Sequence, residues 1–292
     1  MSFAAAMREP GDTVGAAVEA AAARLAQVGI PSARLDAELL LARACGSDRA
    51  TLYAHWRHPL SSSAHQGFSA SLQRRLEREP LPYICGSQEF WSLAFAVSAD
   101  VLIPRPETEV LVELALQDAT RRATAGTTIC EVGTGSGCVA VALACELPDV
   151  EIWALDISAP ALRVARGNAR RHQVAARVHF LRSDLLGGVR TSAFDLVVSN
   201  PPYVSTDVLS GLAPELHWEP RRALDGGSAG LDVIARLLPQ AYACLKPAGC
   251  LIMEIGADQR EAADRLARAA GFSRVTIEPD YAGRPRALFA RR

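Results

Sequence analysis

After Val110, short apolar runs alternate with helical segments, and this alternation limits the fold more than any other feature of the sequence. Regular succession of strand and helix predicts a parallel sheet with helices on both faces. The tail of the chain, with apolar runs at Arg274–Glu278 and Arg286–Ala290, is expected to form a closing hairpin at the sheet edge. The five preceding strands are expected at Thr128–Val132, Glu151–Leu155, Val178–Leu181, Phe194–Ser199 and Cys250–Ile255.

The first part of the chain has a different pattern. Between Thr13 and about Glu79, apolar residues recur at helical spacing, with a breaker at Gly29–Ser32. This pattern predicts a small helical bundle over residues 1–80. The bundle has no chemical constellation of its own, so its simplest role is to cap, position or recognise something for the next domain, and we expect substrate recognition. Residues 81–105 contain an alternating, aromatic stretch that is typical of a hairpin or extended linker. Residues 106–292 are then the sheet domain.

Composition limits the function classes. Hydrophobic residues make up 49% of the 292 residues, and the net charge of −1 gives no general attraction for nucleic acid. None of the 7 cysteines forms a Cys-x-x-Cys pair, so no metal site is expected. The apolar runs are shorter than a membrane span and the chain begins without a secretory signal, so we expect a cytoplasmic protein with no membrane partner.

A glycine-rich loop follows the first expected strand. The segment Glu131-Val132-Gly133-Thr134-Gly135 leads to Gly137 with Gly-x-Gly-x-Gly spacing, which fails the Gly-x-Gly-x-x-Gly pattern of dinucleotide sites. A carboxylate at Glu131 would repel a pyrophosphate but attract a sulfonium and an ammonium group. S-adenosylmethionine therefore fits the loop better than a dinucleotide does. The alternative is a glycine turn that only packs a helix on a strand.

Two further acidic residues follow expected strands. Asp156 ends the second strand, where a carboxylate can accept hydrogen bonds from ribose hydroxyls, although it could instead cap the next helix. Asp184 follows the third strand and is a candidate acceptor for the adenine amino group, with Leu185 as an apolar surface for the ring. A simple turn residue is an equal alternative for Asp184.

The tetrapeptide Asn200-Pro201-Pro202-Tyr203 follows the fourth strand, at the sheet edge where the glycine loop is expected. The nitrogen of an amide or aromatic amino group is a poor nucleophile, and its buried N–H groups need acceptors. The side-chain carbonyl of Asn200 and the backbone carbonyl of Pro201 can supply them, while Tyr203 can pack on the planar group. This arrangement predicts methylation of a planar nitrogen. The alternative is a proline-rich turn.

The chain resembles the bacterial release factor glutamine N5-methyltransferases over nearly its whole length. The tetrapeptide alone is shared with nucleic-acid amino methyltransferases, whereas the run Ile103–Glu109 is more discriminating. The other matching segments are Arg34–Leu41, Gln88–Trp91, the glycine loop, Glu219-Pro220 and Ala223–Gly227. The resemblance implies a Rossmann-like α/β fold of class I S-adenosylmethionine methyltransferases, with an N-terminal helical domain. Leu185 departs from members that carry an aromatic residue there.

The resemblance also implies a substrate and a set of contacts. The substrate would be the glutamine of the Gly-Gly-Gln sequence in class I peptide chain release factors, with S-adenosylhomocysteine as the product and no direct nucleic-acid partner. Arg105, Glu107 and Thr108 match the family beside the site, where they could brace the cofactor or serve as linker ion pairs and helix caps. The implied cofactor contacts are Glu131 to Gly135, Asp156 and Asn200, and the implied substrate contacts are Asn200 to Tyr203. A nucleic-acid methyltransferase and a scaffold without catalysis are the rival readings.

Overall fold

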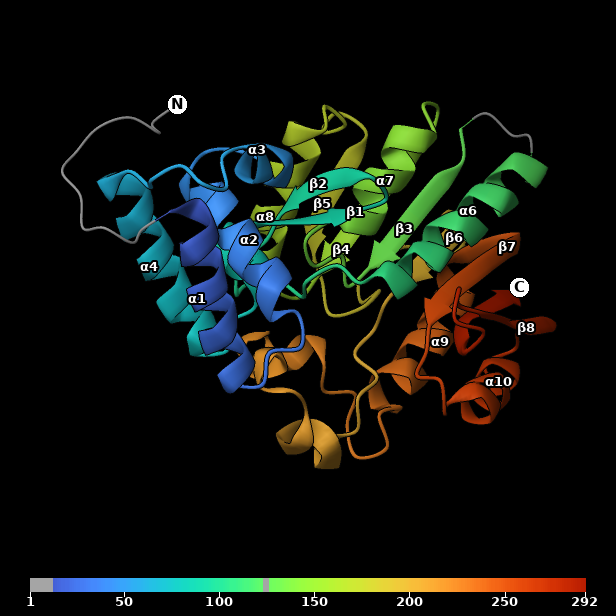
Figure 1. Ribbon diagram of the computed structural model, residues 1–292. Helices are drawn as coiled ribbons and strands as arrows, with labels where there is room; N and C mark the ends of the chain where they lie inside the picture. Colours follow the sequence, from blue (N-terminus) through green and yellow to red (C-terminus); the bar gives the residue numbers. More distant parts are fainter. Residues whose placement is uncertain (1–12, 123–125) are drawn as a thin grey trace. The chain divides into compact units, whose positions relative to one another are not determined.

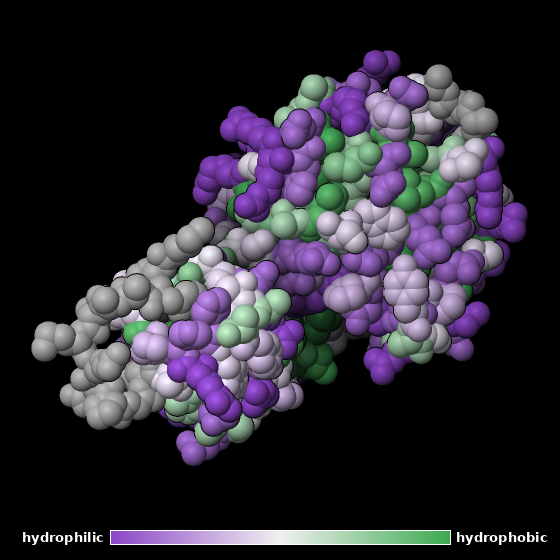
Figure 2. All heavy atoms as spheres, turned by 45° about the horizontal axis from the view of Figure 1, so that its top comes forward, coloured by the Kyte–Doolittle hydropathy of each residue, from purple (hydrophilic) through white to green (hydrophobic). Residues whose placement is uncertain are grey.

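The computed structural model describes residues 13–122 and 126–292. Its backbone forms two compact units. The helical unit contains the described residues up to Gly86 together with Pro214–Trp218, and the sheet unit contains Ser87–Ala213 and Glu219–Arg292. No helix within the described ranges is both long and apolar enough to cross a membrane. On the face drawn in Figure 2, hydrophilic side chains surround smaller hydrophobic patches.

The helical unit confirms the expected bundle. Hydroxyl or carboxylate side chains cap three of its helices: Thr13, Asp48 and Ser61 each accept a hydrogen bond from a backbone N–H in the first turn. The apolar side chains of α1 lie on one face and pack into a common core with α2 and α4. The helices are α1 (Val14–Gln27), α2 (Ala33–Ala44), α3 (Arg49–Ala54), α4 (Ser62–Leu76) and α5 (Leu81–Cys85).

A short segment from much later in the chain completes the helical unit. Glu215, in the 3-10 helix η3 (Pro214–Trp218), accepts hydrogen bonds from Arg75 at 3.0 Å and from Arg78 at 2.7 Å. Arg75 is buried and also pairs with Asp36 at 2.7 Å. Since removing one partner from a buried ion pair leaves an uncompensated charge, this network ties the segment firmly to the helices.

The sheet unit has seven strands in the order β5-β4-β3-β6-β7-β9-β8. The first five in this order are parallel, whereas β9 pairs antiparallel with both β7 and β8. The α/β fold and the closing hairpin are therefore confirmed, although the last parallel strand begins at Leu245 rather than Cys250. The strands are β3 (Thr128–Val132), β4 (Glu151–Asp156), β5 (Val178–Arg182), β6 (Phe194–Ser199), β7 (Leu245–Glu254), β8 (Arg274–Pro279) and β9 (Pro285–Arg291).

Helices cover both faces of the sheet, as Figure 1 shows. Successive residues of β3 enter different cores: Ile129 packs with α6 and α7, whereas Cys130 packs with α9 and α10. A hairpin of β1 (Ser87–Phe90) and β2 (Leu93–Ala96) adds Phe90 and Phe95 to the first core. The helices are α6 (Glu109–Arg122), α7 (Cys138–Glu146), α8 (Ala159–Arg171), α9 (Asp232–Cys244) and α10 (Arg260–Ala269).

The strand register brings the carboxyl ends of β3, β4 and β6 to one edge. Val132 lies beside Leu155 on one side and Ser199 on the other. The residues that follow these strands therefore emerge together, as expected for ligand sites in parallel sheets. The backbone N–H groups of Gly133 and Thr134 both donate to the carbonyl of Leu155, which fixes the start of the glycine loop.

Candidate active site

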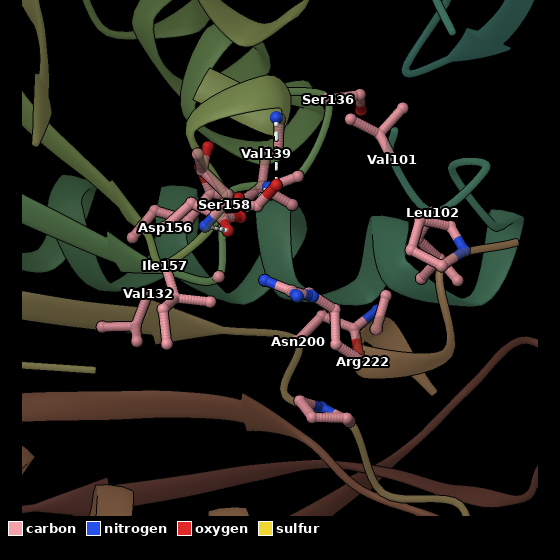
Figure 3. Close-up of a pocket in the computed structure, with 18 of the residues that line it drawn as sticks. Val101, Leu102, Val132, Ser136, Val139, Asp156, Ile157, Ser158, Asn200 and Arg222 are labelled. Carbon is pink, nitrogen blue, oxygen red and sulfur yellow. Dashed lines mark hydrogen bonds between the residues drawn. The ribbon is translucent and has the colours of Figure 1, made fainter. Parts of the chain in front are cut away.

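A cavity of about 280 Å³ lies at this edge of the sheet unit (Figure 3). In that view, Asn200 and Arg222 lie across the cavity from Asp156 and Ser158. Pro201 and Tyr203 are not among the described residues that line it. Ten of the twelve cofactor and substrate contacts expected from the sequence do line it: Glu131, Val132, Gly133, Thr134, Gly135, Asp156, Asp184, Leu185, Asn200 and Pro202. Arg105 and Thr108 line it as well.

The glycine loop needs its glycines for two different reasons. Gly133, Gly135 and Gly137 have φ angles of +76°, +55° and +80°, a region that residues with a Cβ rarely adopt. A Cβ on Gly137 would also lie 3.0 Å from the Cβ of Ala165, so this glycine lets α7 and α8 approach closely. A Cβ on Gly135 would meet no atom within 4 Å, so its backbone faces open space in the cavity wall.

Glu131 lines the cavity, and most of the residue is buried. Its carboxyl group accepts hydrogen bonds from the Thr134 hydroxyl and from the backbone N–H of Ala140 in α7, the latter at 3.1 Å. Burial raises the pKa of Glu131 to about 8, and the two hydrogen bonds only partly oppose this shift. A cation placed beside Glu131 would favour the ionised carboxylate and lower that pKa again.

Asp156 joins two segments of the cavity wall. Its carboxylate accepts the backbone N–H of Gly135 at 2.9 Å and that of Ser158 at 2.8 Å, while Ser158 itself caps α8. Burial raises the pKa of Asp156, and the two N–H groups and the guanidinium of Arg222 act in the opposite direction. Asp156 thus braces the turn before α8, yet its oxygens also border the cavity, where free lone pairs can accept hydroxyl donors.

Asp184 and Leu185 lie at the outer rim. The Asp184 carboxylate forms an ion pair with Arg236 at 2.6 Å, and both side chains are more than half exposed. Leu185 has a φ of +51°, which turns the chain sharply after β5, and its side chain contacts the core beneath α9 and α10. The structure therefore gives Asp184 an ion-pair partner, Arg236, that the sequence pattern did not indicate.

Asn200 belongs to a buried hydrogen-bond network. Its side-chain nitrogen donates to the hydroxyl oxygen of Thr108 at 3.0 Å, and that hydroxyl donates to Glu254 at 2.7 Å. The second oxygen of Glu254 accepts the Tyr203 hydroxyl at 2.9 Å. Tyr203 thus faces Glu254 and the core, while the backbone around it carries Pro202 to the cavity.

The sequence pattern did not indicate Glu254, and it indicated Glu219 only as part of a segment that matches the family, without a role. Glu219 is buried and accepts hydrogen bonds from the backbone N–H of Ile103 at 3.0 Å and from the Arg105 guanidinium. This pair links two segments that line the cavity, one ending at Arg105 and one beginning at Pro220. For Glu254, a signal was available in the sequence, because this acidic residue lies within the apolar run Leu251 to Ile255.

The cavity residues fit S-adenosylmethionine. Two carboxyl groups, from Glu131 and Asp156, line the cavity, and such groups can attract a cation and accept hydrogen bonds from hydroxyl groups. The open backbone at Gly135 leaves room for close approach of a ligand, and Ile157 and Leu185 offer apolar surface for an aromatic ring. Among the described residues, no group of three or more metal-ligating side chains is present.

Comparisons with known proteins agree with this fit. Residues 107–278 match the family model for the methyltransferase small domain, and residues 16–86 match that for the PrmC N-terminal domain. A crystal structure of a methyltransferase from Pyrococcus furiosus shares the fold, with a TM-score of 0.52, 18% identity and coverage of 75% of this chain and 97% of that one. The sheet, the glycine loop and the acidic strand ends define the class: the chain is an S-adenosylmethionine-dependent methyltransferase.

The curated relatives narrow the class. Release factor glutamine methyltransferase from Moorella thermoacetica is 44% identical over 96% of this chain and 99% of its own length. The protein of the same name from Cereibacter sphaeroides is 43% identical over 94% of this chain and 97% of its own. The chain belongs to the release factor glutamine methyltransferase family.

Proposed function

We propose that this protein methylates the side-chain amide nitrogen, N5, of the glutamine in the Gly-Gly-Gln sequence of class I peptide chain release factors, and thereby modulates translation termination. The observation that carries the proposal is the state of Asn200. Its amide nitrogen is bound to Thr108 at 3.0 Å, while its carbonyl oxygen accepts no hydrogen bond from the described residues. The Asn200 carbonyl oxygen can therefore accept a hydrogen bond from a ligand in the cavity.

The clamp consists of two acceptors. The Asn200 carbonyl takes one hydrogen of the glutamine amide, and the other goes to the backbone carbonyl of Pro201, which does not line the cavity itself but lies between two residues that do, Asn200 and Pro202. Pro201 and Pro202 have fixed φ angles and lack N–H groups, so no backbone donor at these two positions competes for the site. Tyr203, whose hydroxyl is fixed by Glu254, holds the end of the tetrapeptide in place. Catalysis by these residues is mainly positioning of the amide nitrogen.

The remaining cavity residues hold the cofactor. Glu131 faces its cationic amino-acid part, the backbone of Val132 to Gly135 lies along it, and Asp156 accepts the ribose hydroxyls. Asp184 and Leu185 border the adenine. When bound, S-adenosylmethionine supplies a methyl group on a positively charged sulfur, so that transfer forms a carbon–nitrogen bond, leaves the carbon–sulfur electron pair on S-adenosylhomocysteine and releases one amide proton.

The helical unit is the part of the protein that we assign to recognition of the release factor. It has its own core, and none of its described residues lines the cavity, which fits a role other than chemistry. Since release factors act on ribosomes, the enzyme would work in the cytoplasm.

Transfer of labelled methyl groups tests this function. The full-length protein is incubated with labelled S-adenosylmethionine and, in separate reactions, with a release factor, total ribosomal protein and total RNA. Label is expected in the release factor alone, and a factor whose Gly-Gly-Gln glutamine is replaced by alanine should receive none. Label found only in RNA would instead support a nucleic-acid methyltransferase that flips a base into the same acceptors.

A further inference from the structure

Asn200 is held by residues from two distant segments. Thr108 ends the 3-10 helix η1 (Pro106–Thr108), and Glu254 is the last residue of β7. Both side chains are buried, with 2% of Thr108 and 1% of Glu254 exposed. The three side chains form a single line of hydrogen bonds from the core to the cavity wall.

The line has a direction because each group has a fixed number of protons. Thr108 has one hydroxyl proton, and an ionised Glu254 has none to give. Thr108 therefore donates to Glu254, and its oxygen can only accept from Asn200. This arrangement turns the NH₂ end of the Asn200 amide toward the core, and the carbonyl end is left for the cavity.

We propose that Thr108 and Glu254 are positioning residues that select the orientation of the Asn200 side-chain amide, so that its oxygen faces the glutamine amide. The inference rests on the proposed function, in which Asn200 is an acceptor. An asparagine amide turned by half a rotation would present NH₂ to the NH₂ of the substrate, and two donors cannot pair. The network converts a residue with two polar ends into a dedicated acceptor.

The direction of this line depends on an ionised Glu254, and two hydroxyl donors and one guanidinium favour that state against the effect of burial. The Tyr203 hydroxyl and the Thr108 hydroxyl each donate to one carboxylate oxygen. Burial raises the pKa of Glu254 and the nearby Glu107 acts in the same direction, whereas these two hydrogen bonds and the guanidinium of Arg286 on β9 favour the carboxylate. Each oxygen of an ionised Glu254 thus has one hydroxyl donor, so neither oxygen is left without a hydrogen bond.

Thr108→Val removes the hydroxyl and nearly preserves the shape, so it tests the role of Thr108. We expect kcat to fall about tenfold while the affinity for S-adenosylmethionine changes less than about twofold, because the Asn200 amide loses its preferred orientation. Thr108→Ser keeps the hydroxyl and should retain kcat within about threefold. Thr120→Val is the matched control, since the Thr120 hydroxyl donates to the backbone carbonyl of Leu116 on the exposed side of α6.

Glu254→Gln tests the other end of the line. A glutamine side chain has an NH₂ group as well as a carbonyl oxygen, so the Thr108 hydroxyl is no longer forced to donate to residue 254. We therefore expect kcat to fall about tenfold, as in Thr108→Val. Both residues act through the Asn200 amide. The variant that combines Thr108→Val with Glu254→Gln should therefore have a kcat no lower than that of the slower single variant. Multiplied losses in the combined variant, or wild-type kcat in Thr108→Val, would overturn the proposal.

A spectroscopic measurement tests the orientation without substrate. The sequence contains two asparagines, Asn168 and Asn200, so protein labelled with ¹⁵N at asparagine side chains gives two NH₂ signals. The Asn168 amide donates to the carbonyls of Ala96 and Ser136 and serves as an internal reference. The Asn200 signal should shift and exchange faster with solvent in Thr108→Val, but should stay near its wild-type position in Thr108→Ser.

These measurements separate the inference from the proposed function. Failure of the wild-type protein to methylate release factors would contradict the function, yet the NMR result would still decide whether Thr108 orients Asn200. Conversely, wild-type activity on release factors together with an unchanged Asn200 signal in folded Thr108→Val would leave the function intact and overturn the inference.

Discussion

The amide nitrogen of Asn200 donates to the hydroxyl oxygen of Thr108 at 3.0 Å, although the two residues stand 92 positions apart in the chain. The contact joins the tetrapeptide after β6 to the segment that precedes α6. It connects residues 103–109, the segment that best distinguishes the family, to the proposed substrate acceptors on Asn200 and Pro201.

Replacement of Asn200 by alanine should remove methyl transfer but spare most of the cofactor binding. One acceptor for the substrate amide is lost, and loss of a positioned transition-state contact typically lowers kcat at least about a hundredfold. Single-turnover transfer and calorimetric titration with S-adenosylmethionine measure the two effects separately. Unchanged turnover in a correctly folded Asn200→Ala variant would refute the role of Asn200 as an acceptor.

Asp156→Ala should weaken cofactor binding about tenfold or more, because hydrogen bonds to a charged acceptor are lost. Calorimetric titration measures this change. Asp195→Ala is a suitable control, since Asp195 likewise accepts a backbone N–H, from Thr128, but does not line the cavity. The control should lose stability only. Equal affinities in wild type and Asp156→Ala would mean that Asp156 only braces the turn before α8.

Cofactor affinity should depend on pH through Glu131, whose pKa is raised by burial to about 8. A cationic ligand prefers the carboxylate, so below pH 8 binding must release a proton. Affinity should therefore rise with pH, by at most about tenfold per unit, and level off above pH 8. Titration calorimetry in buffers of different ionisation enthalpy measures both the affinity and the proton release. Glu131→Gln should bind more weakly at pH 9 and show no such dependence.

Glu131 should also make the stability of the protein depend on pH. Stability should fall as pH rises, whereas cofactor affinity should rise. The folded protein holds a proton on Glu131 that the unfolded chain loses near pH 4.5, so this contribution to stability is complete below pH 4.5 and is lost as pH rises through about 8. Glu131→Gln has no such loss. In urea unfolding, its stability relative to wild type should increase between pH 5 and pH 8.5. A difference that stays constant across this range would contradict the raised pKa.

Glu219→Gln should loosen the segment that contains Ile103 and Arg105. The glutamine can still accept the Ile103 N–H but loses its charge for Arg105, whose side chain is about one-third exposed. We expect the KM for S-adenosylmethionine to rise several-fold with little change in kcat, since only the cavity wall is affected. Asp264→Asn, which removes an exposed ion pair with Arg268 on α10, is the matched control. A fall in kcat alone would argue for direct involvement in transfer.

Strand positions could be predicted from the sequence because buried parallel strands leave a clear local pattern. The expected strands at Thr128–Val132 and Phe194–Ser199 have the bounds of β3 and β6. The start of β7 was placed five residues late, at Cys250 rather than Leu245, because Lys246, Pro247 and Gly249 interrupt the apolar pattern. The parallel register then explains why the glycine loop, Asp156 and Asn200 line one cavity.

Contacts between distant segments could not be predicted in the same way. The link from Thr108 to Glu254 spans 146 positions, and Glu215 joins helices that end well over a hundred residues earlier. Such pairings depend on how the chain folds back on itself, which no local pattern records. Asp184 is a related case, since its partner Arg236 lies on a helix 52 positions later.

Intact-mass and fragment mass spectrometry of a release factor after incubation with this protein and S-adenosylmethionine tests the central claim most directly. The account predicts the addition of one methyl group, located on the glutamine of the Gly-Gly-Gln sequence, and no addition by the Asn200→Ala variant. A methyl group on any other residue, or an unmodified factor beside methylated RNA, would contradict the account.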